Sequence, residues 1–283
     1  MNVAVGLARL GQPTSFAGRL SADPFGTLLR RHLEHSSVQL DFAVAAAEPA
    51  TIALVELVDG QAHYEFRLGA DFSWSADELR FLPGGAVAVH FGSLASWLPP
   101  GDAAIAEAIG ALRSAGSVLI SYDPNVRPSL LPDAADARQR VEESVGLAHL
   151  VKASLDDLHW LYGSDATADA VAGRWLDLGA SLVVITAGAA GATGWAKGLL
   201  PVSQPALPAE VIDTVGAGDA FMSGLLDGLA RRGLLSPASL ATLTEAATLA
   251  GALTDASRIA GITCSRMGAN PPSRAEADAW PDC

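Results

Sequence analysis

The chain has 283 residues, half of them hydrophobic, and a formal net charge of −13. This length suits one large α/β domain or two small ones, and the acidic balance argues against nucleic acid, whose phosphates bind basic surfaces. Two cysteines, Cys264 and Cys283, make no disulfide framework, and no apolar run approaches the ~18 residues of a membrane span. Because no signal segment opens the chain either, we expect a cytoplasmic protein with neither a membrane nor nucleic acid as partner.

The first predicted elements are a helix over 2–10, which Gly11 ends, and a short strand near 14–17. Asp23-Pro24 marks the start of a second helix, because Asp caps helices and Pro fits their first turn. Residues 38–68 are instead typical of a small antiparallel sheet. Its expected strands are Val38–Val44, Thr51–Val58 and Ala62–Leu68, with Asp59-Gly60 as the hairpin turn between the last two.

From residue 75 onward, helices alternate with apolar strands, a pattern that predicts a mostly parallel sheet covered on both faces. The expected strands are 87–91, 118–122, 150–152, 182–186, 193–196 and 199–203. The expected helices are 101–114, 135–148, 155–161, 167–178, 217–232 and 237–256, and the Pro-rich tail from Ala269 is expected at the surface. We predict an α/β domain over 1–37 and 69–283, with the small β-sheet of 38–68 inserted in it.

Polar residues follow three of the expected parallel strands. In open parallel sheets, ligands bind beyond the carboxyl ends of the strands, so these residues predict a ligand site at one edge of the sheet. They are Asp123, Asn125 and Arg127 after one strand, Lys152 and Ser154 after the next, and Thr186 and Gly188 after the third.

The residues themselves leave structural alternatives open. Asp123 and Asn125 could form an Asx turn. Arg127 could form a surface ion pair rather than bind a phosphate or an acidic substrate. Lys152 could snorkel outward from its strand end, and Ser154 could cap the helix that follows it.

The most specific segment is Asp213-Thr-Val-Gly-Ala-Gly-Asp-Ala-Phe221. Gly216 and Gly218 allow a tight turn, and an apolar helical pattern begins just after Asp219. Amides at such a helix N-terminus attract anions. A carboxylate beside them could take a proton from a hydroxyl while the amides hold a phosphate. The alternative is an ordinary turn in which Asp219 caps the helix.

This nine-residue segment closely resembles the signature of the PfkB (ribokinase-like) sugar kinases, and bacterial fructokinases look most similar. Weaker family-like segments occur in the same order along nearly the whole chain: 2–11, 18–26, 123–128, 152–157, 186–191 and 266–272. The resemblance implies a ribokinase-like three-layer α/β/α fold in which residues 38–68 form a lid. It also implies ATP-dependent phosphorylation of a sugar hydroxyl.

The resemblance assigns a role to each matching residue. Asp219 would be the general base, and the amides of Gly216, Ala217 and Gly218 would form an anion hole. The implied ATP-binding residues are Lys152, Ser154, Thr186, Gly188, Gly191, Thr214 and Gly218. The implied sugar-binding residues are Asn2, Asp123, Asn125, Arg127 and Asp219.

Ions and a partner subunit are implied in the same way. The family's Asn-x-x-Glu motif, which organises Mg²⁺, falls at Ser154 to Asp157, and the shorter Asp predicts contact with Mg²⁺ through water. Many family members also bind K⁺, for which the matching positions are Asp213, Val215, Thr263 and Gly268. Lids of this type often pair between subunits, so a homodimer is implied as well.

The chain departs from the family pattern at its start. Family members usually begin with a β-strand that carries a sugar-binding Asp, followed by a Gly-Gly motif that would precede Asn2. Without them the sheet lacks a strand and the sugar pocket lacks a wall. We therefore expect a longer gene product to be active and this form to be impaired, with a truncated paralogue as the alternative.

D-Fructose, phosphorylated to fructose 6-phosphate, is the substrate that the resemblance favours. The alternatives are a 2-keto-3-deoxygluconate kinase, for which Arg127 would bind the acid, a ribokinase and a nucleoside kinase. A P-loop kinase is disfavoured because the chain has no G-x-x-x-x-G-K-[ST], and a Rossmann dehydrogenase because its glycine spacing is absent. An alternative of another class is a non-catalytic sugar- or nucleotide-binding protein.

Overall fold

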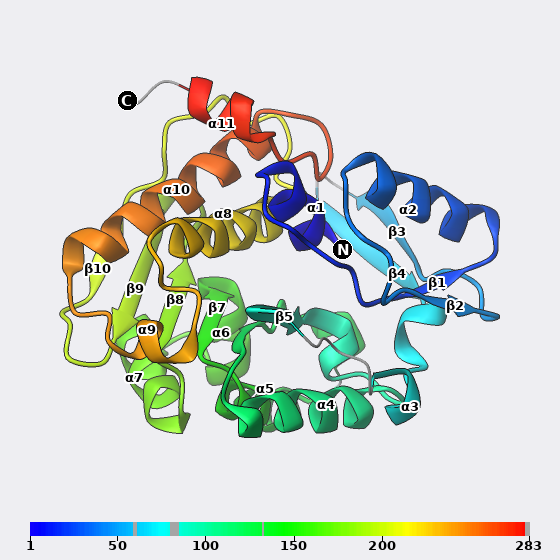
Figure 1. The fold of residues 1–283 in the computed structure, drawn as a ribbon, viewed down its shortest axis with the longest axis horizontal. Helices are drawn as coiled ribbons and strands as arrows, with labels where there is room; N and C mark the ends of the chain where they lie inside the picture. Colours follow the sequence, from blue (N-terminus) through cyan, green and yellow to red (C-terminus); the bar gives the residue numbers. More distant parts are fainter. Residues whose placement is uncertain (59–60, 80–84, 132, 281–283) are drawn as a thin grey trace.

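The computed structural model describes residues 1–58, 61–79, 85–131 and 133–280 (Figure 1). Its centre is a six-stranded sheet in the order β10-β9-β8-β7-β6-β5, in which β5 to β8 are parallel and β9 is antiparallel to both of its neighbours, β8 and β10. The strands are β5 Ala88–Gly92, β6 Leu119–Asp123, β7 Leu150–Ser154, β8 Leu182–Thr186, β9 Ala192–Ala196 and β10 Val202–Gln204. The prediction of a mostly parallel sheet is confirmed.

Helices cover both faces of this sheet, because successive strand residues point to opposite sides. Ile120 and Val151 belong to a buried cluster with helices α4 to α7, whereas Leu119 and Leu150 belong to another with α1, α8, α9 and α10. The first group comprises α4 Asp102–Ala115, α5 Ala134–Leu147, α6 Leu155–Tyr162 and α7 Ala168–Leu178. The second comprises α1 Asn2–Arg9, α8 Ala217–Arg231, α9 Pro237–Ala241 and α10 Ala246–Cys264. The result is the three-layer arrangement of Figure 1.

The C-terminal helices differ from the prediction in two places. The single helix expected over 237–256 is two, because the chain leaves helical geometry after α9 and restarts at the N-cap Glu245. The break contains Thr242 and Thr244, whose β-branched side chains have low helix propensity. The tail forms a further helix, α11 Arg274–Ala279, with a Ser273/Glu276 capping box that is already legible in the sequence.

The region before β5 is more divided than the sequence suggested. The hairpin is confirmed in strands β3 Ile52–Val58 and β4 Gln61–Arg67, while the expected turn at Asp59-Gly60 lies outside the described residues, as does Cys283. Residues 38–43 form no strand: β2 Val44–Ala46 pairs in parallel with β1 Arg19–Ser21, and 14–17 contribute only an isolated bridge. The parallel pairing arises because helix α2 Pro24–His35 connects the two strands as a crossover.

Strand β5 forms one edge of the central sheet. Among the described residues it pairs only with β6, so no counterpart of the N-terminal family strand appears beside it. Helix α1 packs against α8 close to this edge (Figure 1). Along the parts of the chain that are described, no helix combines the length and apolar character that crossing a membrane requires.

Candidate active site

A glycine turn opens helix α8. Gly216, the N-cap residue, has φ +76°, and a Cβ added there would lie 2.5 Å from the Cβ of Ala269. Both the left-handed backbone and the close approach therefore require glycine. Asp213 stabilises the turn, because its carboxylate accepts hydrogen bonds from the backbone amides of Val215 at 2.9 Å and Gly268 at 2.8 Å. These backbone hydrogen bonds lower the pKa of Asp213.

The turn presents backbone amides to the outside. The Ala217 amide donates to the Thr214 carbonyl at 3.2 Å. Within the described ranges, the amides of Gly216, Gly218 and Asp219 have no protein acceptor. They sit at the N-terminus of a 15-residue helix, where the backbone dipoles favour an anion. Of the three amides predicted to form an anion hole, those of Gly216 and Gly218 are therefore free and that of Ala217 is engaged within the turn, and the role of the turn in binding an anion stays a prediction.

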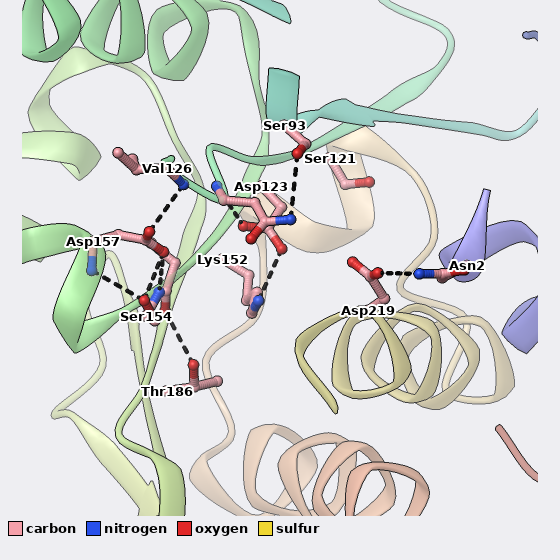
Figure 2. Close-up of polar contacts among 12 residues, drawn as sticks. Asn2, Ser93, Ser121, Asp123, Val126, Lys152, Ser154, Asp157, Thr186 and Asp219 are labelled. Carbon is pink, nitrogen blue, oxygen red and sulfur yellow. Dashed lines mark hydrogen bonds and ion pairs between the residues drawn. The ribbon is translucent and has the colours of Figure 1, made fainter. Parts of the chain in front are cut away.

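Asp219 projects from the first turn of α8 toward helix α1. Its Oδ2 accepts a hydrogen bond of 2.8 Å from the side-chain amide of Asn2, as Figure 2 shows. The N-cap of α8 is Gly216, which has no side-chain cap. The alternative in which Asp219 caps the helix is therefore wrong, and its carboxylate faces away from the helix backbone.

Lys152 and Asp123 form a buried ion pair behind the turn. The Lys152 Nζ lies 2.8 Å from the Asp123 Oδ2, and each side chain is only 5% exposed. Burial raises the pKa of Asp123 to about 6, against the opposing attraction of Lys152. Asp123 also raises the pKa of Lys152, although burial alone would lower it. A Cβ added at Gly218 would lie 3.0 Å from Nζ, so Lys152 points into the site rather than snorkelling outward.

The loop after β6 is braced by its own polar groups. The Asn125 amide donates to Asp123 Oδ1 at 3.1 Å, so the Asx turn coexists with the ion pair. Asn125 has φ +41°, and its side-chain amide lies 3.3 Å from the hydroxyl of Ser93, which has φ +56°. Arg127 donates to the carbonyls of Asn125 and Val126 at 3.2 and 2.9 Å. Its guanidinium thus stabilises the loop.

Ser154 and Asp157 form a capping box at the start of α6. The Ser154 hydroxyl accepts the Asp157 amide, and the Asp157 Oδ2 accepts from the Ser154 hydroxyl and amide at 2.7 and 3.0 Å. The other oxygen of Asp157 accepts the Val126 amide at 2.9 Å. Both carboxylate oxygens are therefore engaged by the protein. Ser154 is a helix cap, and any contact of Asp157 with a metal through water would share these oxygens.

The comparisons with known proteins identify the family. Residues 1–276 match the model of the pfkB family carbohydrate kinases. The chain belongs to this family. A fructokinase of Rhizobium leguminosarum bv. trifolii is 38% identical over 248 residues, which cover 87% of this chain and 75% of that protein.

Solved structures of fructokinases share the fold of this kinase. The Xylella fastidiosa enzyme with bound ATP matches with a TM-score of 0.88 at 26% identity, over 98% of this chain and 88% of that one. The Vibrio cholerae O395 enzyme, bound to fructose, ADP and calcium, matches with a TM-score of 0.82 at 27% identity and the same coverage. The predicted ribokinase-like α/β fold is confirmed.

The expected nucleotide loop of the kinase follows β8. Thr186 ends the strand, and its hydroxyl lies 3.4 Å from the carbonyl of Ala153 on β7. Gly188 and Gly191 have φ +54° and +93°, and a Cβ at Gly191 would lie 2.1 Å from the Gln204 carbonyl oxygen. The loop is therefore tightly turned beside the Ser154 cap. The roles of these residues and of the exposed Thr214 in binding ATP stay predictions.

The positions expected to bind a monovalent cation lie around one loop junction. Asp213 bridges Val215 and Gly268, and its amide donates to the Cys264 carbonyl, next to Thr263. The Thr263 hydroxyl is turned inward, because it donates to the Ile259 carbonyl at 2.7 Å. Backbone carbonyls and the Asp213 carboxylate are thus the oxygen donors available there. No group of three or more His, Cys, Asp or Glu side chains suited to a metal occurs among the described residues.

Three residues near the site escaped the sequence interpretation. His90 lies on β5 and contacts Ser121 on β6, with 3.0 Å between His90 Nδ1 and the Ser121 hydroxyl. Ser93 follows β5 and contacts Asn125. The sequence signal that could have found His90 is a histidine inside the otherwise apolar run Ala88–Gly92.

Proposed function

We propose that this kinase transfers the γ-phosphoryl group of ATP to a hydroxyl of D-fructose and forms fructose 6-phosphate. The observation that carries the proposal is the Asp219 carboxylate beside the free amides of Gly216 and Gly218 at the start of α8. The relative that is 38% identical and the two solved structures described above are named fructokinases, which supports fructose as the sugar.

In the proposed reaction the acceptor oxygen attacks the γ-phosphorus, the bond to ADP breaks, and the hydroxyl proton passes to Asp219. Asn2 occupies Oδ2, while Oδ1 accepts no hydrogen bond from the described residues and is available for the proton. The amides of Gly216 and Gly218 hold the transferred phosphoryl group, and the Lys152 ammonium, next to Gly218, attracts its negative charge. Positioning and charge stabilisation account for most of the acceleration in phosphoryl transfer.

A neutral sugar suits the charges of the site better than an acidic one. Arg127 is engaged by two carbonyls of its own loop, and Lys152 is paired with Asp123. A substrate carboxylate would have to displace one of these contacts. This favours fructose over 2-keto-3-deoxygluconate.

We propose Mg²⁺ bound mainly by the phosphates and water, since Mg²⁺ in kinases usually keeps several waters and few protein ligands. Asp157 would contact one of those waters, and the ion would neutralise phosphate charge. K⁺, a hard cation, fits the oxygen donors around Asp213 and Gly268. The Vibrio cholerae fructokinase holds calcium, and a double mutant of it holds potassium, which supports ion use in this fold.

We also propose that residues 38–68 close over the sugar and pair between two subunits. Leu54 on β3 and Leu68 after β4 are 42% and 46% exposed, and a second subunit would cover them. Closure would exclude water and limit hydrolysis of ATP.

An ATP-coupled assay against a panel of sugars, with Asp219→Ala beside the wild type, tests the function. D-Fructose should be the preferred acceptor, and the variant should lose about 10²- to 10⁴-fold in kcat, the usual contribution of a general base. ATP binding, followed by calorimetry, should be unchanged. The matched control is Asp177→Asn on the exposed side of α7, which should keep the wild-type rate. A wild-type kcat in Asp219→Ala would refute the assignment.

A further inference from the structure

We propose that His90 Nε2 forms a hydrogen bond with a sugar hydroxyl other than the one that reacts, and so orients the substrate at Asp219. The proposal rests on the sugar-kinase function and adds a specificity-determining residue to it.

The first argument is position. On β5, Val89 and Phe91 pack against the cluster of helices α4 to α7, and Ala88 packs against the opposite cluster. Strand alternation puts His90 on the Ala88 side, which is the side of α1 and α8. The charges of Asp219, Lys152 and the N-terminal amine all act on the pKa of His90, so its ring lies within their reach. Among the described residues no strand covers the outer edge of β5.

The second argument is the free ring nitrogen. His90 Nδ1 lies 3.0 Å from the Ser121 hydroxyl, which fixes the orientation of the ring. Among the described residues Nε2 has no hydrogen-bond partner, and it can bind a hydroxyl as acceptor or as donor, since a hydroxyl offers both. Burial lowers the pKa of His90 to about 4, so the ring stays neutral near pH 7.

The third argument is chemical. A sugar carries several hydroxyl groups, each of which can donate and accept a hydrogen bond. Asp219 would take the proton of the hydroxyl that is phosphorylated, and His90 Nε2 would bind a second hydroxyl of the same sugar.

The strand is also held rigidly at this point. A Cβ added at Gly92, with φ +149°, would lie 2.1 Å from the Asp123 carbonyl oxygen, so β5 and the end of β6 are in close contact. Ser93 and Asn125, both with positive φ, link the two strand ends. Such strained residues persist where the surrounding structure over-determines them, often at functional sites. His90 is thus carried on a fixed support, as a specificity residue must be.

A pair of near-isosteric variants tests the proposal. In His90→Gln the side-chain amide group can take the place of Nε2, whereas in His90→Asn it can take only the place of Nδ1. We expect KM for the preferred sugar to rise about tenfold in His90→Asn, the loss of one hydrogen bond, and less than threefold in His90→Gln. KM for ATP should be unchanged in both. His35→Asn on the exposed part of α2 is the control and should match the wild type.

Deoxy analogues of the sugar give the decisive readout. The wild type should bind the deoxy analogue that lacks the hydroxyl contacted by His90 about tenfold more weakly than the parent sugar. His90→Asn should bind this analogue and the parent sugar equally, because the protein partner of that hydroxyl is gone. Sugar binding is also measured by calorimetry without turnover. If the wild type phosphorylates a sugar and His90→Asn leaves KM and analogue preference unchanged, the His90 proposal fails and the kinase function stands. If the wild type binds a sugar without phosphorylating it, the kinase function fails, and weaker binding by His90→Asn would still support the role of His90.

Discussion

Helix α8, which carries Asp219, is buried along ten consecutive residues from Ala220 to Leu229, whereas the β3–β4 hairpin is a two-stranded sheet with Leu54 exposed. The rest of the proposed lid is held by both apolar and polar contacts: Val38 and Leu40 pack in a cluster with Val5 of α1, and Arg19 on β1 bonds Glu48. The helix that carries Asp219 is thus deeply buried, whereas the hairpin proposed to close over the sugar exposes an apolar side chain. We therefore expect local opening to cost less free energy in the hairpin than in α8.

The largest effect is expected from breaking the buried ion pair of Lys152 and Asp123. Lys152→Met should lower the free energy of unfolding by about 3–5 kcal/mol, because it leaves the Asp123 charge buried without its partner. The double variant Lys152→Met/Asp123→Leu should recover most of that stability without recovering turnover. Denaturant titration measures the stability of each variant, and the ATP-coupled assay measures its turnover. A double variant that is both stable and active would show that the pair is merely structural.

The glycine turn should be the next most sensitive point. Gly216→Ala combines a left-handed backbone with a contact of 2.5 Å to Ala269, so we expect a loss of about 2–4 kcal/mol from strain and overpacking together. Gly233→Ala is a matched control, because Gly233 has φ +71° and no atom within 4 Å of an added Cβ. It should cost about 1 kcal/mol through the backbone alone. Equal losses in both would contradict the close packing of the turn.

A smaller effect is expected from pH. The pKa of Asp123 is about 6 in the folded chain, above its ordinary value of 3.8, so the folded state takes up this proton more readily than the unfolded state. Between those two pH values the folded state binds more protons, and lowering the pH from 6 toward 4 stabilises it through Asp123. Thermal unfolding of the wild type relative to Asp123→Asn should show this difference. A relative stability that rises with pH over the same window would reverse the assignment.

The smallest effect on stability is expected in the hairpin region. Leu54→Ser and Leu68→Ser replace exposed side chains and should change the free energy of unfolding by less than about 0.5 kcal/mol. If the hairpins pair between subunits, the same changes should shift the mass measured by light scattering from dimer to monomer. A monomeric wild type, or a dimer unaffected by both variants, would remove the hairpin from the interface.

Local signals in the chain were enough for much of the fold. The Asp23-Pro24 start of α2, the alternation that predicted β5 to β8, and the Gly-Ala-Gly-Asp turn all appear where expected. The partners of β2 were not readable, since pairing depends on the crossover through α2 rather than on residues 38–44 themselves. The sequence left Ser154 open as a helix cap or a ligand; the observed capping box confirms the cap, and a role in binding ATP stays a prediction.

The sequence by itself determined the family, the layered α/β architecture and the carboxylate beside a glycine turn, because these depend on short-range patterns of apolar spacing and turn residues. Only the tertiary structure decided that Asn2 bonds Asp219, 217 positions away, that Lys152 pairs with Asp123, and that His90 contacts Ser121 on the neighbouring strand. Those contacts join strand ends and helix starts that are distant in the chain. Their geometry is set by how the layers pack, and no local pattern encodes it.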